Sequence, residues 1–384
     1  MKSTLTEQGI VVYIKGQYYL VNELTFKLLQ YYYKEIPISE IACMLELDEN
    51  YVIKLYKEIS NKLLEGNTFK SDIDFKQPLK VQWKITNRCN IRCKHCYEGE
   101  KNREQLSDKQ IAAVFDKLIE SDIQELSITG GEALLVNNLS NYIHRCLDNG
   151  IRVNLFTNGI LLHSFINDLG ENVNKKLLTF EISVDGSRIE HDYIRGEGNY
   201  EKTIRNIKYA IRHGYKISTN TVINGITKTS IIQMMNELHR IGVLKIQLSN
   251  LMLRGWASVN KDELYISYDE VKKVYNEISK KIHFPFLYAD ITNNIYLVDK
   301  NNSHKKEGKN NWRCCAGQAR VTIDFNGDVL LCPLCNNYSI GNIIEMSLTE
   351  IWNSPLRKIY REKLINLNKG KNVCFIYDQD IKIK

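Results

Sequence analysis

The stretch TNRCNIRCKHCYEG, residues 86–99, places Cys89, Cys93 and Cys96 within eight residues, in the spacing C-x3-C-x2-C. Cysteine thiolates are the usual ligands of iron–sulfur clusters, and a cluster of four irons takes four ligands. Three thiolates on one loop leave one iron open, and an open position is typical of a catalytic metal site. The alternative is a zinc site with a distant fourth ligand. His95 lies too close to Cys93 and Cys96 to bind the same metal easily.

The whole chain of 384 residues is long enough for two or three domains, each with its own core. It contains no apolar run of the roughly 18 residues that a transmembrane helix needs. Its first residues lack the apolar region of a secretory signal. We therefore expect a cytoplasmic protein, in which ten cysteines indicate metal ligands or catalytic groups rather than disulfides.

The net charge of +7 is modest and unevenly distributed. Residues 1–70 contain eight lysines and no arginine against nine acidic residues, a net charge of −1. No dense stripe of lysine and arginine supports a nucleic-acid surface, so no nucleic-acid partner is expected. The remaining positive charge is compatible with a solvated surface, anionic small molecules or acidic peptides.

Residues 80–283 alternate strand and helix patterns. Six β-then-α units predict a parallel sheet with right-handed crossovers. The predicted strands are 81–86, 125–131, 152–159, 177–186, 216–224 and 244–252. In such sheets the chemistry gathers at the carboxyl ends of the strands. Polar and glycine motifs lie at those ends: Thr86-Asn87, Thr129-Gly130-Gly131-Glu132, Thr157-Asn158-Gly159 and Ser183-Val184-Asp185-Gly186.

Together, the cysteine triplet and TGGEAL at 129–134 resemble the radical SAM enzymes. These enzymes carry C-x3-C-x-Φ-C after the first strand of a partial β/α barrel, with Φ usually aromatic and His95 in that position here. The resemblance implies a partial (β/α)6 barrel, α/β in class, and a [4Fe–4S] cluster on Cys89, Cys93 and Cys96. It further implies that S-adenosylmethionine caps the open iron and yields a 5′-deoxyadenosyl radical that abstracts hydrogen from a substrate.

The strand-end motifs suit the binding of that cofactor. Gly130 and Gly131 would let the backbone approach the ligand closely. Glu132 would offer a carboxylate to the methionine ammonium group. For each polar residue at a strand end, the alternative is a turn or a helix cap.

By the same resemblance, Ser183 and Asp185 stand in an SxDG motif, whose serine would bond a ribose hydroxyl. Arg195 would meet the methionine carboxylate, a suitable partner for a guanidinium. Asn220 and Leu251, in the later strands, would line the adenosine.

The tail, residues 284–384, resembles the SPASM/twitch extension of radical SAM enzymes. Cys315, Gly327 and Cys332 fit its cysteine–glycine–cysteine pattern, and SIGNIIEMSLTEIWNSP resembles the segment that follows. The later cysteines of a full SPASM pattern are missing, which predicts a small α+β, twitch-like domain with one auxiliary [4Fe–4S] cluster. Its candidate ligands are Cys314 or Cys315, Cys332, Cys335 and Cys374. Zinc is the alternative, because four thiolates also suit zinc.

The front zone, residues 1–75, has a predicted hairpin at 10–21 followed by three helical patterns, a winged-helix-like layout. Ser39 and Asp48 stand where caps of the second and third helices would lie. The charge of −1 argues against DNA binding. The zone resembles instead the PqqD-like domain, or RiPP recognition element. That resemblance implies a domain that binds the leader of a precursor peptide as an added strand.

The three zones together resemble maturases of ribosomally made peptides, above all the sactipeptide type that includes the sporulation killing factor maturases. We therefore predict a radical SAM enzyme that joins a cysteine sulfur to a carbon, with a flavodoxin- or ferredoxin-type electron donor. Attachment at a β- or γ-carbon, a carbon–carbon crosslink and epimerisation remain open. The rivals are a sulfatase-maturase-like oxidoreductase and a non-enzymatic iron–sulfur regulator with a winged helix.

Overall fold

The computed structural model describes most of the chain, which forms two compact units at 1–76 and 77–384. The described residues are 2–6, 9–14, 17–21, 23–33, 36–64, 75, 77–101, 103–121, 123–243, 245–284, 286–289, 295–298, 316–333 and 338–368.

The first unit is a three-stranded antiparallel sheet followed by three helices. Its elements are β1 (Lys2–Thr6), β2 (Gly9–Ile14), β3 (Gln17–Val21), α1 (Glu23–Tyr33), α2 (Ile38–Leu45) and α3 (Glu49–Leu64). The predicted hairpin is β2–β3, and β1 is a further strand that the sequence analysis did not find. A small core of Leu28, Ile41, Ala42 and Val52 joins the helices.

The two predicted helix caps of this unit differ in outcome. Asp48 caps α3, since its Oδ1 accepts from the N–H of Tyr51 at 3.1 Å. Ser39 is not a cap, because α2 already begins at Ile38, after Pro37. A proline is favourable at a helix start, since its ring fixes φ and the first turn needs no N–H donor from it.

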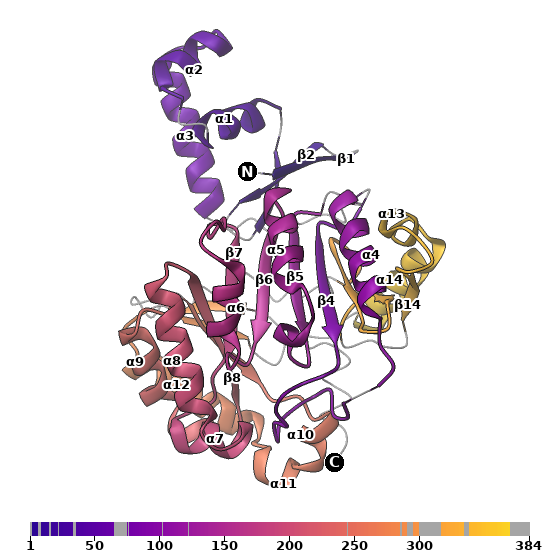
Figure 1. Ribbon diagram of the computed structural model, residues 1–384. Coiled ribbons are helices and arrows are strands. Elements are labelled where there is room, and N and C mark those ends of the chain that lie inside the picture. The colour runs from indigo at the N-terminus through magenta and orange to yellow at the C-terminus, as the bar shows by residue number, and fades with distance from the viewer. Residues whose placement is uncertain are drawn as a thin grey trace. The chain divides into compact units, whose positions relative to one another are not determined.

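The second unit is built on one sheet with the strand order β11-β10-β9-β8-β7-β6-β5-β4-β12-β13-β14. Its centre is six parallel strands, as the sequence predicted: β4 (Lys80–Thr86), β5 (Glu125–Gly130), β6 (Arg152–Thr157), β7 (Leu178–Ser183), β8 (Lys216–Ile223) and β9 (Lys245–Asn250). The fold is therefore the predicted α/β arrangement, with each parallel strand followed by helical crossovers (Figure 1).

Helices cover the apolar side of these strands, and Figure 1 shows α4, α5 and α6 lying over one face of the sheet. The helical elements are α4 (Asp108–Glu120), η1 (Ala133–Leu135), α5 (Leu139–Asp148), α6 (Leu162–Leu169), α7 (Arg188–Arg195), α8 (Asn199–Arg212), η2 (Thr227–Thr229), α9 (Ile231–Arg240), α10 (Gly255–Val259), α11 (Lys261–Leu264) and α12 (Tyr268–Lys281). Trp83 of β4 packs on Phe115 of α4 with ring centroids 4.9 Å apart, and both are fully buried.

Polar residues alternate with these apolar ones along the strands, as a period of two requires. Lys80 of β4 pairs with Glu125 of β5 at 3.3 Å, and Lys245 of β9 pairs with Glu181 of β7 at 3.5 Å. Each strand therefore sends apolar groups to the helices and polar groups to its other face.

The tail extends the sheet at both edges. Strand β10 (Phe286–Ala289) pairs with β9 and β11 (Ile295–Val298), whereas β12 (Arg320–Ile323) pairs with β4 and leads to β13 (Asp328–Leu330) and β14 (Ser339–Asn342). The sheet thus continues through the boundary predicted near residue 284. A turn at Asn326-Gly327 joins β12 to β13, and Gly327 has φ +90°. Two helices follow β14, α13 (Leu348–Trp352) and α14 (Pro355–Asn368).

In the part of the chain that the structure describes, no helix combines the length and apolar character needed to cross a membrane.

Candidate active site

The cluster loop, residues 87–100, follows β4 and carries Cys89, Cys93 and Cys96, all partly exposed. Backbone contacts fix it to distant elements. The N–H of Lys94 donates to Ile194 O at 2.9 Å, and the N–H of Trp256 donates to Cys96 O at 2.8 Å. The loop therefore has a defined path between α7 and α10.

Cations lie against two of the three thiols. Arg195 Nη1 is 3.7 Å from Cys93 Sγ, and Lys101 Nζ is 3.5 Å from Cys96 Sγ. Burial nevertheless raises the pKa of the Cys93 thiol to about 12 and also raises the pKa of Cys89. A thiolate at Cys89 or Cys93 would therefore need the positive charge of a bound metal to stabilise it.

This donor set fits an iron–sulfur cluster. It consists of three sulfur donors on one loop, with neighbouring cations that would offset the negative charge of thiolates. Among the described residues, no three His, Cys, Asp or Glu side chains converge on a single-ion site.

A buried charged network joins the cluster loop to β7 and α7. Asp185 is fully buried, and its Oδ2 lies 2.6 Å from Arg195 Nε and 2.8 Å from His95 Nε2. Its Oδ1 accepts from the N–H of Val222 at 2.8 Å. Burial alone would raise the pKa of the Asp185 carboxyl, but Arg195 and His95 lower it well below its usual range.

The two glycines of TGGEAL serve the protein's own backbone. A Cβ at Gly130 would lie 2.3 Å from Thr86 O, and one at Gly131 would lie 2.1 Å from Arg88 O. The N–H of Gly131 donates to Thr86 O at 2.7 Å. The close approach predicted for these glycines is therefore made to the start of the cluster loop, and contact with a ligand is not needed to explain them.

Glu132 is buried, with 1% of its surface exposed. Its carboxylate accepts from the N–H of Leu134 at 3.1 Å, from Thr157 Oγ1 at 2.7 Å and from the N–H of Asn158 at 2.8 Å. Burial raises the pKa of Glu132, and these donors oppose that rise. Glu132 therefore caps η1, as one alternative foresaw, and also joins the ends of β5 and β6.

The remaining predicted cofactor residues lie at the ends of later strands. Ser183 ends β7 and is in register with Asn220 of β8. Ser249 Oγ donates to Asn220 Oδ1 at 2.7 Å, and Leu251 follows β9 directly. All three predicted residues are partly exposed. Because they lie at or near the carboxyl ends of parallel strands, the topology gathers them at the same edge of the sheet as the cluster loop.

Of the predicted auxiliary ligands, Cys332 lies just after β13 and is partly exposed. Cys314, Cys315, Cys335 and Cys374 lie outside the described residues. The chain following Cys315 nevertheless meets the chain preceding Cys332. A Cβ at Gly317 would lie 2.6 Å from Leu331 Cδ2. The donor chemistry of cysteine and this proximity fit one shared sulfur-ligated site.

A second group of ion pairs, which was not predicted from the sequence, joins β4, the cluster loop and the tail. Lys84 of β4 is 3% exposed and lies 2.8 Å from Glu98 of the cluster loop and 3.8 Å from Asp324 of the tail. Arg103 pairs with Glu98 at 3.0 Å and covers the ring of Phe325 at 4.4 Å. The sequence showed only a lysine inside a largely apolar strand. Its two partners could not be recognised there, because they come from separate parts of the chain.

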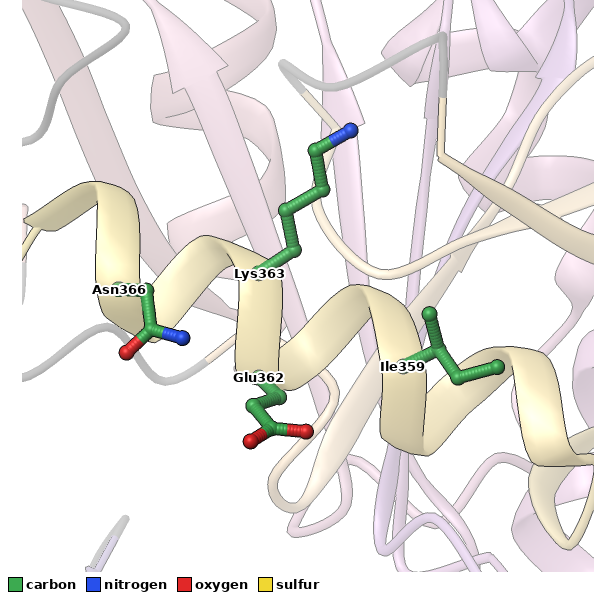
Figure 2. Close-up of a pocket in the computed structure, with 4 residues that line it drawn as sticks. All are labelled: Ile359, Glu362, Lys363 and Asn366. Atoms are coloured by element: carbon green, nitrogen blue, oxygen red, sulfur yellow. The ribbon is translucent and has the colours of Figure 1, made fainter.

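A hollow of about 450 Å³ lies elsewhere, along one face of α14, where Ile359, Glu362, Lys363 and Asn366 line it (Figure 2). These residues are one helical face at spacings of three and four, open to solvent. Among the described residues, no predicted site residue lines the hollow.

Comparisons with known proteins agree with this geometry. Residues 83–238 match the model of the radical SAM superfamily, and residues 314–375 match that of the SPASM iron–sulfur cluster-binding domain. The chain is similar to the sporulation killing factor maturation protein SkfB of Bacillus subtilis, with 24% identity over 74% of this chain and 67% of that protein. It is also similar to the antilisterial bacteriocin subtilosin biosynthesis protein AlbA of the same organism, with 25% identity over 81% and 66%.

Among solved structures, Streptococcus suis SuiB bound to S-adenosylmethionine matches with a TM-score of 0.67 and 16% identity, over 94% of this chain and 88% of that one. That likeness shows the fold. A radical SAM domain implies a [4Fe–4S] cluster and S-adenosylmethionine, and a SPASM domain implies auxiliary iron–sulfur binding. This chain therefore carries a radical SAM domain followed by a SPASM domain.

Proposed function

We propose that this protein matures a ribosomally synthesised peptide by forming a thioether between a cysteine sulfur and a carbon of another residue. The observation that carries the proposal is the similarity to a killing-factor maturation protein and a subtilosin biosynthesis protein over about three quarters of the chain. The radical SAM and SPASM domains together supply the two kinds of iron–sulfur site that such chemistry uses.

Cys89, Cys93 and Cys96 would hold the cluster, which with bound S-adenosylmethionine supplies a 5′-deoxyadenosyl radical. Glu132 uses three of about four acceptor sites on its carboxylate, which leaves one for the methionine ammonium. Arg195 has five N–H donors and directs one at Asp185 and one at Cys93. Its remaining donors could meet the methionine carboxylate. Ser183, Asn220 and Leu251 would line the adenosine.

The net reaction removes two hydrogens from the peptide. The acceptor carbon loses a hydrogen atom to the deoxyadenosyl radical, and the cysteine thiol loses a proton as its sulfur bonds to that carbon. One electron remains, which an auxiliary cluster held by the tail cysteines would accept. The electron that starts each turnover would come from a flavodoxin- or ferredoxin-type protein.

We further propose three domains, at 1–75, 80–283 and 284–384, with the first binding the leader of the precursor. Among the described residues, β3 pairs only with β2, so its other edge is available for an added strand. Tyr51 of α3 is 46% exposed and offers an aromatic surface to leader side chains. The structure of Streptococcus suis SuiB bound to precursor peptide SuiA shares this fold.

The auxiliary site would hold one [4Fe–4S] cluster on Cys332, Cys335, Cys374 and either Cys314 or Cys315. Iron and sulfide analysis of a variant with Cys89, Cys93 and Cys96 changed to alanine tests this assignment. Retained iron and sulfide support the cluster, whereas zinc without iron contradicts it.

The function is tested by the intact mass of a short cysteine-containing peptide encoded beside the gene, after anaerobic co-expression with this protein. A loss of two hydrogens per bond, absent with Cys89→Ala, supports a crosslinking maturase. Fragmentation then locates the bond at sulfur or between two carbons. An unchanged mass in ordinary water, together with uptake of deuterium when the co-expression is run in deuterated water, indicates epimerisation and contradicts thioether formation.

A further inference from the structure

The helices α10 and α11, which follow β9, lie directly against the cluster loop. The N–H of Trp256 donates to Cys96 O at 2.8 Å, and Asn260 Nδ2 donates to Lys94 O at 2.9 Å. A Cβ added at Gly255 would lie 2.7 Å from Cys96 O, so the two backbones approach each other as closely as a glycine allows. This two-helix segment is therefore in contact with the part of the loop that carries the third cysteine.

The side chain of Asn260 makes a contact that its place in the chain does not require. Asn260 stands at the start of α11, where the side-chain oxygen of an asparagine commonly accepts from the backbone of the new helix. It makes no such bond. Its Nδ2 donates instead to Lys94 O and to Trp256 O, at 2.9 and 3.0 Å. Because both partners are carbonyl oxygens, the group that faces them is the amide NH2. The side chain is thus directed at the cluster loop.

Lys94, which accepts this bond, follows Cys93 in the cluster loop. Its N–H donates to Ile194 O of α7 at 2.9 Å, so the peptide groups on both sides of Lys94 are held by other elements. The N–H of Cys96 donates to Cys93 O at 3.2 Å, which closes a turn between the two cysteines. Because a peptide unit is planar, fixing the Lys94 carbonyl also fixes the orientation of the next amide. The relative positions of the two thiols therefore depend on the Asn260 contact.

The side chain of Lys94 is held less firmly than its carbonyl. Lys94 Nζ lies 3.2 Å from Glu263 Oε2 and 4.0 Å from the centre of the Tyr193 ring. Tyr193 OH donates to the same carboxylate oxygen at 2.7 Å. The side chains of Lys94 and Glu263 are 31% and 43% exposed, and ion pairs with this exposure contribute little to stability. The partly buried amide contact is therefore the one whose loss should affect the loop.

We propose that Asn260 is a positioning residue of the radical SAM cluster. It holds the turn between Cys93 and Cys96 so that their thiolates and that of Cys89 face the same cluster. Groups that orient metal ligands in this way typically contribute about 10- to 100-fold to metal affinity. This inference rests on the proposed assignment of the three cysteines as cluster ligands, and it does not depend on the kind of bond made in the peptide.

Asn236 supplies a matched control. Its Nδ2 donates to Ile232 O, four residues earlier in α9, at 2.9 Å. Asn260 makes the same local contact with Trp256 O, also four residues earlier, and both asparagines are partly buried. Asn236→Asp therefore loses the same local bond and adds the same negative charge as Asn260→Asp. The bond to the cluster loop belongs to Asn260.

The first measurement is the rate at which the anaerobically reconstituted full chain loses iron to a chelator. A variant with Cys89, Cys93 and Cys96 changed to alanine reports iron bound elsewhere, and its loss is subtracted. Asn260→Asp and Asn260→Ala are expected to speed the remaining loss about 10- to 100-fold. Asn260→Gln keeps an amide donor on a longer arm and is expected to recover part of the wild-type rate. Asn236→Asp is expected to leave the rate unchanged.

The second measurement separates positioning of the cluster from simple docking of α10. Electron paramagnetic resonance of the reduced protein follows the change in the cluster signal as S-adenosylmethionine is added. Asn260→Ala is expected to shift this titration to higher concentrations of S-adenosylmethionine, because a displaced turn presents the open iron in the wrong direction. A residue that only docks its helix would lower the free energy of unfolding in urea and leave the titration in place.

Two results would overturn the inference, and they can be told apart. If the wild-type chain retains no more iron than the variant without the three cysteines, the ligand assignment fails and the inference fails with it. If the wild-type chain holds the cluster but the Asn260 variants match Asn236→Asp in both measurements, the ligand assignment stands and Asn260 only docks α10. Should Asn260→Asp not fold, Asn260→Ala and Asn260→Gln decide the question by the same measurements.

Discussion

The cluster loop and the segment 316–319 lie at opposite ends of β4, and they are anchored by different kinds of contact. The cluster loop is held mostly by backbone groups at neighbouring strand ends, such as the N–H groups of Gly131 and Glu132, which donate to Thr86 O and Arg88 O at 2.7 Å each. The segment 316–319 is held at Ala319 by the backbone N–H groups of Leu79 and Lys80, but its first two carbonyls are held by arginine side chains from a helix 40 to 45 residues later.

This difference decides which substitutions each region tolerates. Backbone anchors persist under most side-chain changes and fail where an added Cβ separates the two chains. Side-chain anchors fail when a single charged group is removed. The buried pair Asp185–Arg195 is one exception in the first region, because it fixes the loop through charges.

The largest effect is expected for Asp185→Asn. The change leaves the Arg195 guanidinium buried without its carboxylate, which should lower the free energy of unfolding by about 3–5 kcal/mol. Urea titration of the purified protein measures it. The control is Asp116→Asn, which breaks the half-exposed pair of Asp116 and Arg145 and should cost less than about 1 kcal/mol. Equal costs would mean that backbone contacts alone hold the cluster loop.

A smaller effect is expected for Gly131→Ala. The new Cβ would lie 2.1 Å from Arg88 O, so the two strand ends must separate, at a cost of about 3 kcal/mol. At Gly198, with φ +72° in the left-handed region and no atom within 4 Å, alanine meets only backbone strain of about 1 kcal/mol. Denaturant unfolding of both variants checks the difference. A cost at Gly131 no larger than at Gly198 would show that the strand ends separate easily.

The sequence predicted the centre of the fold because its signals there are local. Each parallel strand has apolar residues in alternation, and each polar motif lies at the end of its strand, so topology alone gathers Cys93, Glu132 and Ser183 at one edge. The three cysteines were recognised because they lie on one short loop. Glu132 was predicted as a site residue and Thr157-Asn158 as a strand-end motif, but the hydrogen bonds between them depend on the pairing of strand ends and were not predicted.

The remaining side-chain contacts were not predictable, because the residues that make them are distant from one another in the sequence. Arg357 and Arg361 look like ordinary helix surface residues until α14 is placed against Gly317. Lys84 finds Glu98 and Asp324 only when β12 pairs with β4. The strand β1 was missed because KSTLT is short and carries little apolar alternation.

The charged network also predicts a pH dependence. Burial, aided by Arg195, lowers the pKa of His191 to about 4. An unfolded histidine titrates near about 6.5, so the unfolded state binds more protons between these values. The free energy of unfolding should therefore fall as pH decreases through this window, by at most about 3 kcal/mol. His191→Gln should flatten this part of the pH profile. An unchanged slope would indicate that His191 is protonated in the folded protein.

The smallest effect is expected at two helices that follow the two regions in the chain. Ser107 caps the start of α4 and Ser347 caps the start of α13. Each forms a capping box, in which the serine side chain accepts from the backbone N–H three residues later. Such contacts are local, so Ser107→Ala and Ser347→Ala should each cost about 1 kcal/mol. Urea titration of the two variants side by side gives the comparison. Equal losses in the free energy of unfolding would mean that the two regions differ only in their long-range contacts. A much larger cost for Ser347→Ala would mean that the start of α13 also carries the contact between Trp352 and Arg357.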